Sequence, residues 1–223
     1  MKISIVIPVL NEERRIGERL AELRAFDEVI VVDGGSSDGT VEIASSFSGV
    51  RVERAPRGRA AQMNHGARLA GGEILLFLHA DVSLPADALE HIQRALGDAR
   101  TVAGAFRTWH VADGGRRTPW LHLADLRSRY SGLPYGDQAL FVRREAFWTA
   151  GGFPDQPLME DLELSQRLRR LGRIAIVPAS VRVSGRRFLA HPIRDSLLVN
   201  VFPLLYRLGV PAASLARLYR DVR

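Results

Sequence analysis

The chain has 223 residues, of which 46% are hydrophobic and 25% charged. This is enough apolar material for one α/β domain of ordinary size, and it excludes a disordered chain. Lysine and arginine outnumber aspartate and glutamate by 31 to 25, and nearly all of that positive charge is arginine. Arginine suits a phosphate-bearing ligand, although a GC-rich genome would produce the same bias. Because no basic run is interleaved with aromatics, no nucleic acid is expected as a partner.

Apolar runs bounded by turn residues alternate with helical patterns through the first hundred residues. Strands are expected at residues 3–9, 28–33, 50–54 and 73–79, and the helices that follow them end near 25, 47, 70 and 97. Asn11 is expected to cap the first helix, and Pro85 to lie in the first turn of the fourth. This order predicts a Rossmann-like, mostly parallel sheet with helices on both faces.

The second half of the chain is less regular. It predicts strands at 102–110, 138–142 and 174–183, a helix or lid at 118–130, and a helix at 160–171 that Gly172 closes. There is no internal repeat and no linker. We expect a catalytic domain over residues 1–190 and a C-terminal helical segment over residues 191–223.

Polar side chains follow the ends of four consecutive strands. They are Asn11 and Glu12, Asp33, Arg57 and Arg59, and His79 with Asp81. Ligands of parallel α/β sheets bind at the carboxyl ends of the strands, so these residues are candidates for a binding site.

Four acidic residues, at three places in the chain, have both a functional and a structural interpretation. Asp81 could hold Mg²⁺ or Mn²⁺ together with diphosphate oxygens, or it could be a solvated loop residue that caps a helix. Asp33 could accept hydrogen bonds from a base or ribose, or it could form an Asx turn. The pair Glu160 and Asp161 opens a helix, where acids favour the macrodipole, but it could equally supply a general base.

Four motifs, in this order over about residues 3–188, resemble a family 2 glycosyltransferase. They are PVLNEE, VVDGGSSDGT, the HAD that follows LLFL, and the acidic pair in MEDLELSQRLRRLG. The resemblance implies the glycosyltransferase-A fold. Three further segments, RGRAAQMNHGARLA, YGDQALFVRREAF and SGRRF, are similar to a bacterial subgroup, the arsenosugar-biosynthesis or radical-SAM/selenodomain-associated transferase 2 type.

The resemblance implies roles for individual residues. Pro8, Leu10 and Glu12 would contact base and ribose, and Asp33 would contact the base. Arg59 would reach the nucleotide, Asp81 would bind the metal, and Asp161 would take the proton of the acceptor hydroxyl. His79 departs from the family pattern, because an aspartate usually stands there. It could take over a ribose contact or bind the metal through nitrogen.

Other residues are candidates for the acceptor side and the leaving group. Gly136, Asp137 and Gln138 could line the acceptor pocket or form only a turn, and Glu160 is placed on the same side. Arg186 and Arg187 could clamp the departing diphosphate, or they could be surface arginines.

The expected reaction is metal-dependent, inverting transfer of a sugar from a nucleotide-sugar, with a UDP-sugar favoured, to a hydroxyl of a small-molecule or lipid acceptor. One rival is a nucleotidyltransferase, which would place a glycine-rich basic loop where PVLNEE stands. Others are a non-catalytic sugar-nucleotide-binding protein and, least favoured, a basic RNA-binding protein.

The C-terminal segment is apolar but interrupted. Residues 196–206 are uncharged, yet the run contains Pro203 and ends at Arg207, which is too broken for a membrane span of about 20 residues. It suits an interfacial helix beside anionic lipid, or a helix packed on the domain or on the partner of a homodimer. The absence of cysteine excludes disulfides and thiolate metal sites and leaves the redox compartment undetermined. No cleavable signal is found, so the expected location is the cytoplasm, with possible contact at the inner face of the cell membrane.

Overall fold

The computed structural model describes residues 1–111, 125, 132–185 and 192–221. Its strands are β1 (Ile3–Val9), β2 (Glu28–Asp33), β3 (Val50–Arg54), β4 (Ile74–Phe77), β5 (Val82–Ser83), β6 (Thr101–Val111), β7 (Phe141–Arg143) and β8 (Arg173–Ser184). Its helices are α1 (Glu13–Glu22), α2 (Thr40–Ser45), α3 (Arg59–Leu69), α4 (Ala88–Leu96), α6 (Arg144–Thr149), α7 (Glu160–Leu171), α8 (Pro192–Arg207) and α9 (Ala212–Asp221), with a 3₁₀ turn, η3 (Gly136–Gln138).

The strands form one sheet in the order β3-β2-β1-β4-β7-β6-β8-β5. β1 is the third strand in this order. It pairs in parallel with β2, where Ile5 is opposite Val29, and with β4, where Ile3 is opposite Ile74. β2 with β3 and β6 with β8 are also parallel, whereas β7 and β5 run antiparallel to their neighbours. The predicted fold class, a mostly parallel sheet flanked by helices, is confirmed.

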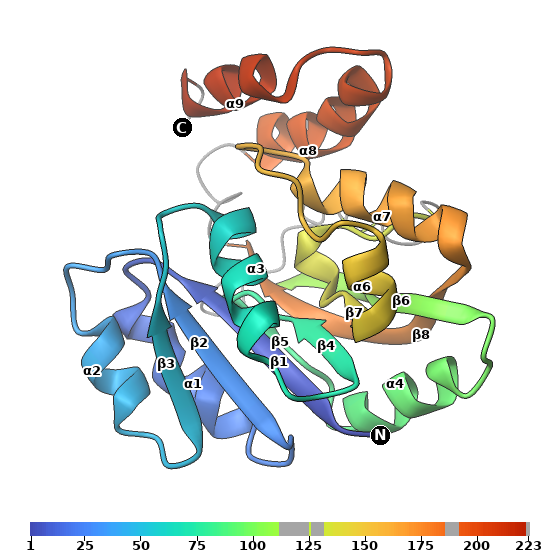
Figure 1. Cartoon of the computed structure of the whole chain (residues 1–223). Coiled ribbons are helices and arrows are strands. Elements are labelled where there is room, and N and C mark those ends of the chain that lie inside the picture. Colours follow the sequence, from blue (N-terminus) through green and yellow to red (C-terminus); the bar gives the residue numbers. More distant parts are fainter. Residues whose placement is uncertain (112–124, 126–131, 186–191, 222–223) are drawn as a thin grey trace.

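Helices cover both faces of this sheet (Figure 1). Successive side chains of a strand point to opposite faces, so β1 serves two cores. Ile5 lies in a core with residues of α1, α2 and α4, such as Leu20 and Ile92. Val6 lies in a second core with α3, α6 and α7, which includes Met63 and Leu164. Both cores are fully buried, and they fix the sheet edge at which the loops converge.

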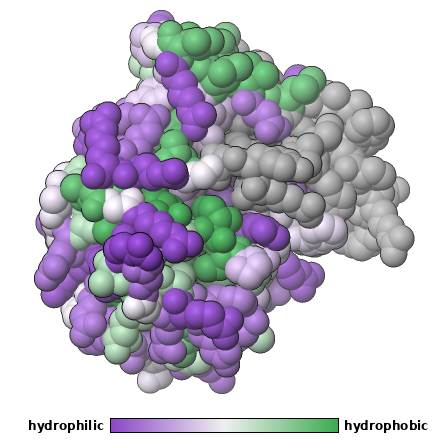
Figure 2. All heavy atoms as spheres, turned by 90° about the vertical axis from the view of Figure 1, so that its right-hand side faces the viewer, coloured by the Kyte–Doolittle hydropathy of each residue, from purple (hydrophilic) through white to green (hydrophobic). Residues whose placement is uncertain are grey.

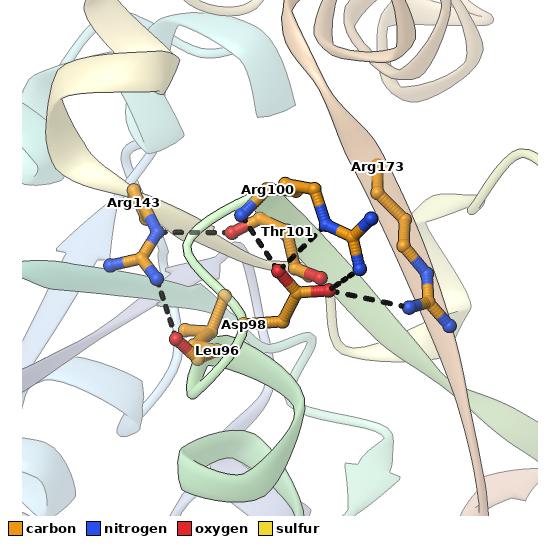
Figure 3. Close-up of polar contacts among 6 residues, drawn as sticks. All are labelled: Leu96, Asp98, Arg100, Thr101, Arg143 and Arg173. Atoms are coloured by element: carbon orange, nitrogen blue, oxygen red, sulfur yellow. Dashed lines mark hydrogen bonds and ion pairs between the residues drawn. The ribbon is translucent and has the colours of Figure 1, made fainter.

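A polar network closes the opposite, amino-terminal edge of the sheet (Figure 3). Asp98 accepts hydrogen bonds from the backbone and side chain of Arg100, and its carboxylate lies 3.6 Å from the guanidinium of Arg173. These bonds lower the pKa of Asp98. Arg143 donates to the carbonyls of Thr101 and Leu96. The network ties the starts of β6 and β8 to the end of β7, far from the carboxyl ends of the strands.

Most predicted elements agree with the structure, but the region around η3 does not. The expected strand over 138–142 is wrong in its first half, since η3 occupies 136–138 and β7 begins at Phe141. The cause is the side chain of Gln138, which accepts from Tyr135 N at 3.0 Å and donates to Phe106 O at 2.8 Å. These bonds close the chain into a turn, and Ala139 leaves it with φ 48°.

Two other boundaries also differ. α4 begins at Ala88, so Pro85 lies in the turn before the helix, where its carbonyl accepts from Ala88 N at 3.0 Å. β4 ends at Phe77, which leaves His79 in the loop after the strand rather than in it. The helix or lid expected at 118–130 falls outside the described residues, apart from Asp125.

The C-terminal helices α8 and α9 lie above α7 (Figure 1). Phe202 of α8 and Leu215 of α9 are buried together with Tyr135, Met159 and Leu162. None of the helices in the described part of the chain is long and apolar enough to cross a membrane. The division of the chain at residue 190 remains a prediction.

Candidate active site

The loops after β1 and β2 are joined by backbone and side-chain hydrogen bonds. Asn11 has φ 55°; its N–H donates to Ser36 Oγ, and its Oδ1 accepts from Ser37 N, both at 2.9 Å. The N–H of Glu12 donates to Thr40 Oγ1 at 2.8 Å. The predicted helix cap at Asn11 is therefore wrong, because its side chain binds the neighbouring loop and α1 begins only at Glu13.

Asp33 ends β2 and is buried. Its carboxylate accepts from Gly35 N at 3.0 Å and from Ser36 N at 3.0 and 3.2 Å. These bonds form the Asx turn that was one of the two interpretations of this residue. A carboxylate has about four lone-pair sites, so the turn leaves some of them for a ligand.

Gln62 is a residue that the sequence interpretation missed. From α3 it reaches the ends of two strands, and its Nε2 donates to Val9 O and Val32 O, both at 2.8 Å. Gly34 passes so close that a Cβ there would lie 3.0 Å from the Gln62 amide. One side chain thus fixes the spacing of the two loops. An amide in the interior of a helix gives no local signal of such a role.

Gly136 brings together His79 and Asp161, which come from opposite halves of the chain. A Cβ built on Gly136 would lie 3.0 Å from His79 Cε1 and 3.1 Å from Asp161 Oδ2. Both side chains therefore border the same small space beside the first residue of η3. This convergence joins the loop after β4 to the start of α7.

Asp161 is held in place by two backbone donors. Gly136 N donates to its Oδ2, and Leu162 N donates to its Oδ1 at 2.7 Å. The residue before the pair, Met159, has φ 65° and turns the chain sharply into α7. The carboxylate is half-buried, with its orientation fixed by neighbours that cannot rotate away.

Glu160 points in another direction and pairs with Arg59. The distance from Arg59 Nε to Glu160 Oε1 is 2.9 Å, and the Glu160 side chain is only 2% exposed, against 41% for Arg59. Burial raises the pKa of Glu160; Arg59 opposes this rise and the adjacent Asp161 adds to it. Within the described residues, Glu160 Oε2 is buried without a hydrogen-bond partner. Such burial does not favour the predicted direct contact of Glu160 with an acceptor.

Asp81 lies half-buried in the loop after β4, two residues beyond His79. Its carbonyl accepts from Ser184 N at the end of β8, and the carbonyl of His79 accepts from Val82 N at 3.1 Å. No cluster of three metal-binding side chains occurs among residues 1–111, 125, 132–185 and 192–221. A single carboxylate still fits Mg²⁺ or Mn²⁺, which are commonly held by one or two carboxylates plus substrate phosphates.

Two arginines of α1 lie beneath this loop and were also missed. Arg15 Nη2 donates to Ser184 Oγ at 3.0 Å, and the buried Arg19 lies 3.5 Å from Ala80 O through Nε. They are four positions apart, so they share one face of the helix. Arg19 also pairs with Glu22, which offsets its charge, so Arg15 and Arg19 support the loop that carries Asp81 mainly through hydrogen bonds.

The remaining predicted residues are placed as follows. Pro8 and Leu10 are half-buried at the end of β1, near Glu12. Asp137 is half-buried in η3, whereas Gln138 is buried and used by the turn, so it does not line an open acceptor pocket. Arg186 and Arg187 lie outside the described residues.

Comparison with known proteins identifies the family. The model of "Glycosyl transferase family 2" matches residues 4–151, which include both loops, the HAD segment and η3. The chain belongs to glycosyl transferase family 2. A PGL/p-HBAD biosynthesis glycosyltransferase of Mycobacterium bovis is 32% identical over 224 residues, covering 93% of this chain and 86% of that protein. The chain spans only 31% and 50% of the length of two further curated relatives.

Solved structures of similar fold include two that hold nucleotides. Glucosyl-3-phosphoglycerate synthase from Mycobacterium tuberculosis, with Mn²⁺, UDP and phosphoglyceric acid, has a TM-score of 0.61 at 24% identity and covers 94% of this chain and 79% of its own. TarS 1–349 from S. aureus, with UDP-GlcNAc, has a TM-score of 0.66 at 21% identity and covers 82% and 58%. At these identities the likeness establishes the fold alone, which agrees with the family.

Proposed function

We propose that this family 2 chain transfers a sugar from a nucleotide-sugar, with a UDP-sugar favoured, to a hydroxyl group of an acceptor, with inversion at the anomeric carbon. The single observation that carries the proposal is the meeting of His79 and Asp161 at Gly136. It puts an oriented carboxylate beside the loop that bears the predicted metal ligand, Asp81.

The donor would lie at the carboxyl ends of β1, β2 and β4. Base and ribose would be held by Pro8, Leu10, Glu12 and Asp33, whose loops are fixed by Asn11 and by Gln62. Arg59, at the start of α3 and half-exposed beside Glu160, would bind a nucleotide phosphate through its guanidinium group. UDP-GlcNAc in one solved structure of this fold and UDP in another support a uridine nucleotide as the donor.

Asp81, with His79 as a second candidate, would hold a divalent metal, Mn²⁺ or Mg²⁺. Such an ion would offset the charge of the diphosphate. The Mn²⁺ of glucosyl-3-phosphoglycerate synthase supports this proposal by fold likeness. Arg186 and Arg187 would contribute positive charge from the segment after β8, while Arg15 and Arg19 hold the neighbouring backbone and Ser184 through hydrogen bonds.

Asp161 would act as the general base. As the acceptor oxygen forms its bond to the anomeric carbon, the hydroxyl proton passes to Asp161, and the bond from that carbon to the phosphate oxygen breaks. The nucleoside diphosphate leaves with the electron pair. Two N–H donors already use part of the carboxylate, but the remaining lone pairs can accept the proton within hydrogen-bond reach.

The experiment that tests the function is a nucleotide-release assay with a panel of UDP- and GDP-sugars, with and without Mn²⁺ and with mixed hydroxyl acceptors. Release of UDP that requires both metal and acceptor supports the proposal. Binding without any release would favour a non-catalytic sugar-nucleotide-binding protein.

We also propose membership of the arsenosugar-biosynthesis or radical-SAM-associated subgroup, on the three matching segments, and a cytoplasmic location.

A further inference from the structure

Helix α8 has one face turned toward the candidate active site. Phe202 is buried against Met159 and Leu162, the residues that flank the acidic pair of α7. Tyr206 reinforces the contact, because its hydroxyl donates to Glu163 Oε2 at 3.2 Å. Helices α8 and α9 are therefore attached to the side of the site where an acceptor would enter, next to Asp161.

The other face of α8 carries a stripe of exposed apolar side chains. Leu197, Val201 and Leu204 are 56%, 41% and 56% exposed, and Leu208, which follows the helix, is 74% exposed. Leu208 N donates to Leu204 O at 3.0 Å, so the helical turn continues to it. At about 100° per residue these four positions fall within a sector of about 60°. Figure 2 shows hydrophobic surface at the top of the molecule, where Figure 1 places α8 and α9.

Positive charge borders this stripe. Arg194, Arg207 and Arg217 are exposed, and Arg194 also pairs with the adjacent Asp195 at 2.9 Å. Residues 191–223 contain five arginines and two aspartates, in a chain of net charge +6. A helix with an apolar stripe bordered by arginine, and too short to span a bilayer, is typical of one that lies in the plane of an anionic membrane surface.

We propose that the α8 stripe, residues 197, 201, 204 and 208, docks this chain on an anionic lipid bilayer, with α8 lying between the membrane and the start of α7. The arginines would contact lipid phosphates while the stripe enters the headgroup region. If the proposed transferase function also holds, its acceptor is a hydroxyl of a molecule held in that bilayer. The docking itself does not depend on the transfer reaction.

The charge pattern argues against a second copy as the occupant. In a two-fold symmetric dimer the same patch meets itself, so the bordering arginines of one copy would approach those of the other. Like charges across an interface oppose association, whereas lipid phosphates complement them. A bilayer therefore satisfies both the apolar stripe and its charged border.

The test is flotation of the full chain with phosphatidylcholine vesicles and with vesicles that also contain phosphatidylglycerol, together with the molar mass in solution. The variant Leu197→Gln/Leu204→Gln/Leu208→Gln removes the stripe. Leu171→Gln, an exposed leucine on α7, is the matched control. Circular dichroism and nucleotide binding check that each variant is folded.

We expect the intact chain to float with the anionic vesicles and less with phosphatidylcholine alone. The triple variant should bind at least about tenfold more weakly, since three apolar side chains are no longer buried, and the control should behave like the intact chain. Asp161→Asn should float normally, which separates docking from catalysis. The proposal is overturned if the intact chain does not float or the triple variant floats equally well. It is also overturned if the intact chain is a dimer that the triple variant makes monomeric.

Discussion

Arg59 and Glu160 form an ion pair, with 2.9 Å between Nε and Oε1, that joins the start of α3 to the start of α7. The donor side and the acceptor side of the proposed site are thus connected by two side chains. The pair directs the Glu160 carboxylate toward Arg59, whereas the Asp161 carboxylate accepts a hydrogen bond from Gly136 N and lies beside His79.

The buried carboxyl of Glu160 should make stability depend on pH. Its pKa in the folded protein is raised above the ordinary value of 4.5, mainly by burial. The folded state then binds more protons than the unfolded state, so this group's contribution to stability is complete below 4.5 and is lost as pH rises through the folded pKa. Denaturant unfolding over a pH series should show Glu160→Gln gaining stability relative to wild type as pH rises. Parallel curves would refute this.

Gly136→Ala should lower turnover while nucleotide binding survives. The added methyl group would lie 3.0 Å from His79 Cε1 and 3.1 Å from Asp161 Oδ2, so one of these side chains must move. Displacement of a catalytic group should cost about tenfold or more in turnover. Gly71→Ala is the control, because its nearest atom would lie at 3.5 Å, away from the site. Equal turnover in the two variants would argue that the space beside Gly136 is not part of the active site.

Gln62→Leu should destabilise the fold. The change keeps the side chain close in size but removes the donor from two strand-end carbonyls, Val9 O and Val32 O. Val9 O keeps the hydrogen bond from Gly34 N at 3.0 Å, but each carbonyl loses the one from Gln62, and loss of such buried hydrogen bonds costs about 1–3 kcal/mol. Urea unfolding measures the difference in free energy. A variant as stable as wild type would mean that water replaces the amide and that Gln62 does not set the loop spacing.

Asp81→Ala should abolish the effect of Mn²⁺ on nucleotide binding. With its carboxylate gone, the ion loses the one acidic side chain proposed to hold it, and Mn²⁺ should no longer enhance the thermal stabilisation by UDP. Asp87→Ala, which removes an exposed carboxylate just before α4, is the matched control. Retention of the full Mn²⁺ effect in Asp81→Ala would exclude this residue as the main ligand.

The fold could be predicted from sequence to the extent that its signals are local. β2 and α7 begin and end at the predicted residues. The signal for β2 is a short apolar run, and the signals for α7 are acidic residues at its start and Gly172 at its end, all of which lie within the element or next to it. The prediction that Asn11 caps α1 was wrong because the preference of asparagine for helix caps is a local signal, whereas the partner of its side chain, Ser37, lies on another loop.

The residues of the candidate site could be named from the sequence, but their contacts could not. Glu160 and Asp161 look equivalent in sequence, and only the fold brings Arg59 to one and Gly136 to the other. The turn at η3 depends on where Gln138 finds its backbone partners, one of which lies on β6. Such partners are set by tertiary packing, which hydrophobic periodicity does not encode.

The most direct test of the account is the turnover of Asp161→Asn. Asparagine keeps the size of the side chain and an oxygen that can accept from Gly136 N, but it cannot take up the acceptor's proton. Nucleotide affinity should be unchanged, and turnover should fall by roughly 10²-fold or more, the usual scale for a lost general base. Asp137→Asn, in η3, is the comparison and should retain most of its activity. Near-normal turnover of Asp161→Asn, with Asp137→Asn inactive, would contradict the account and assign the base to Asp137.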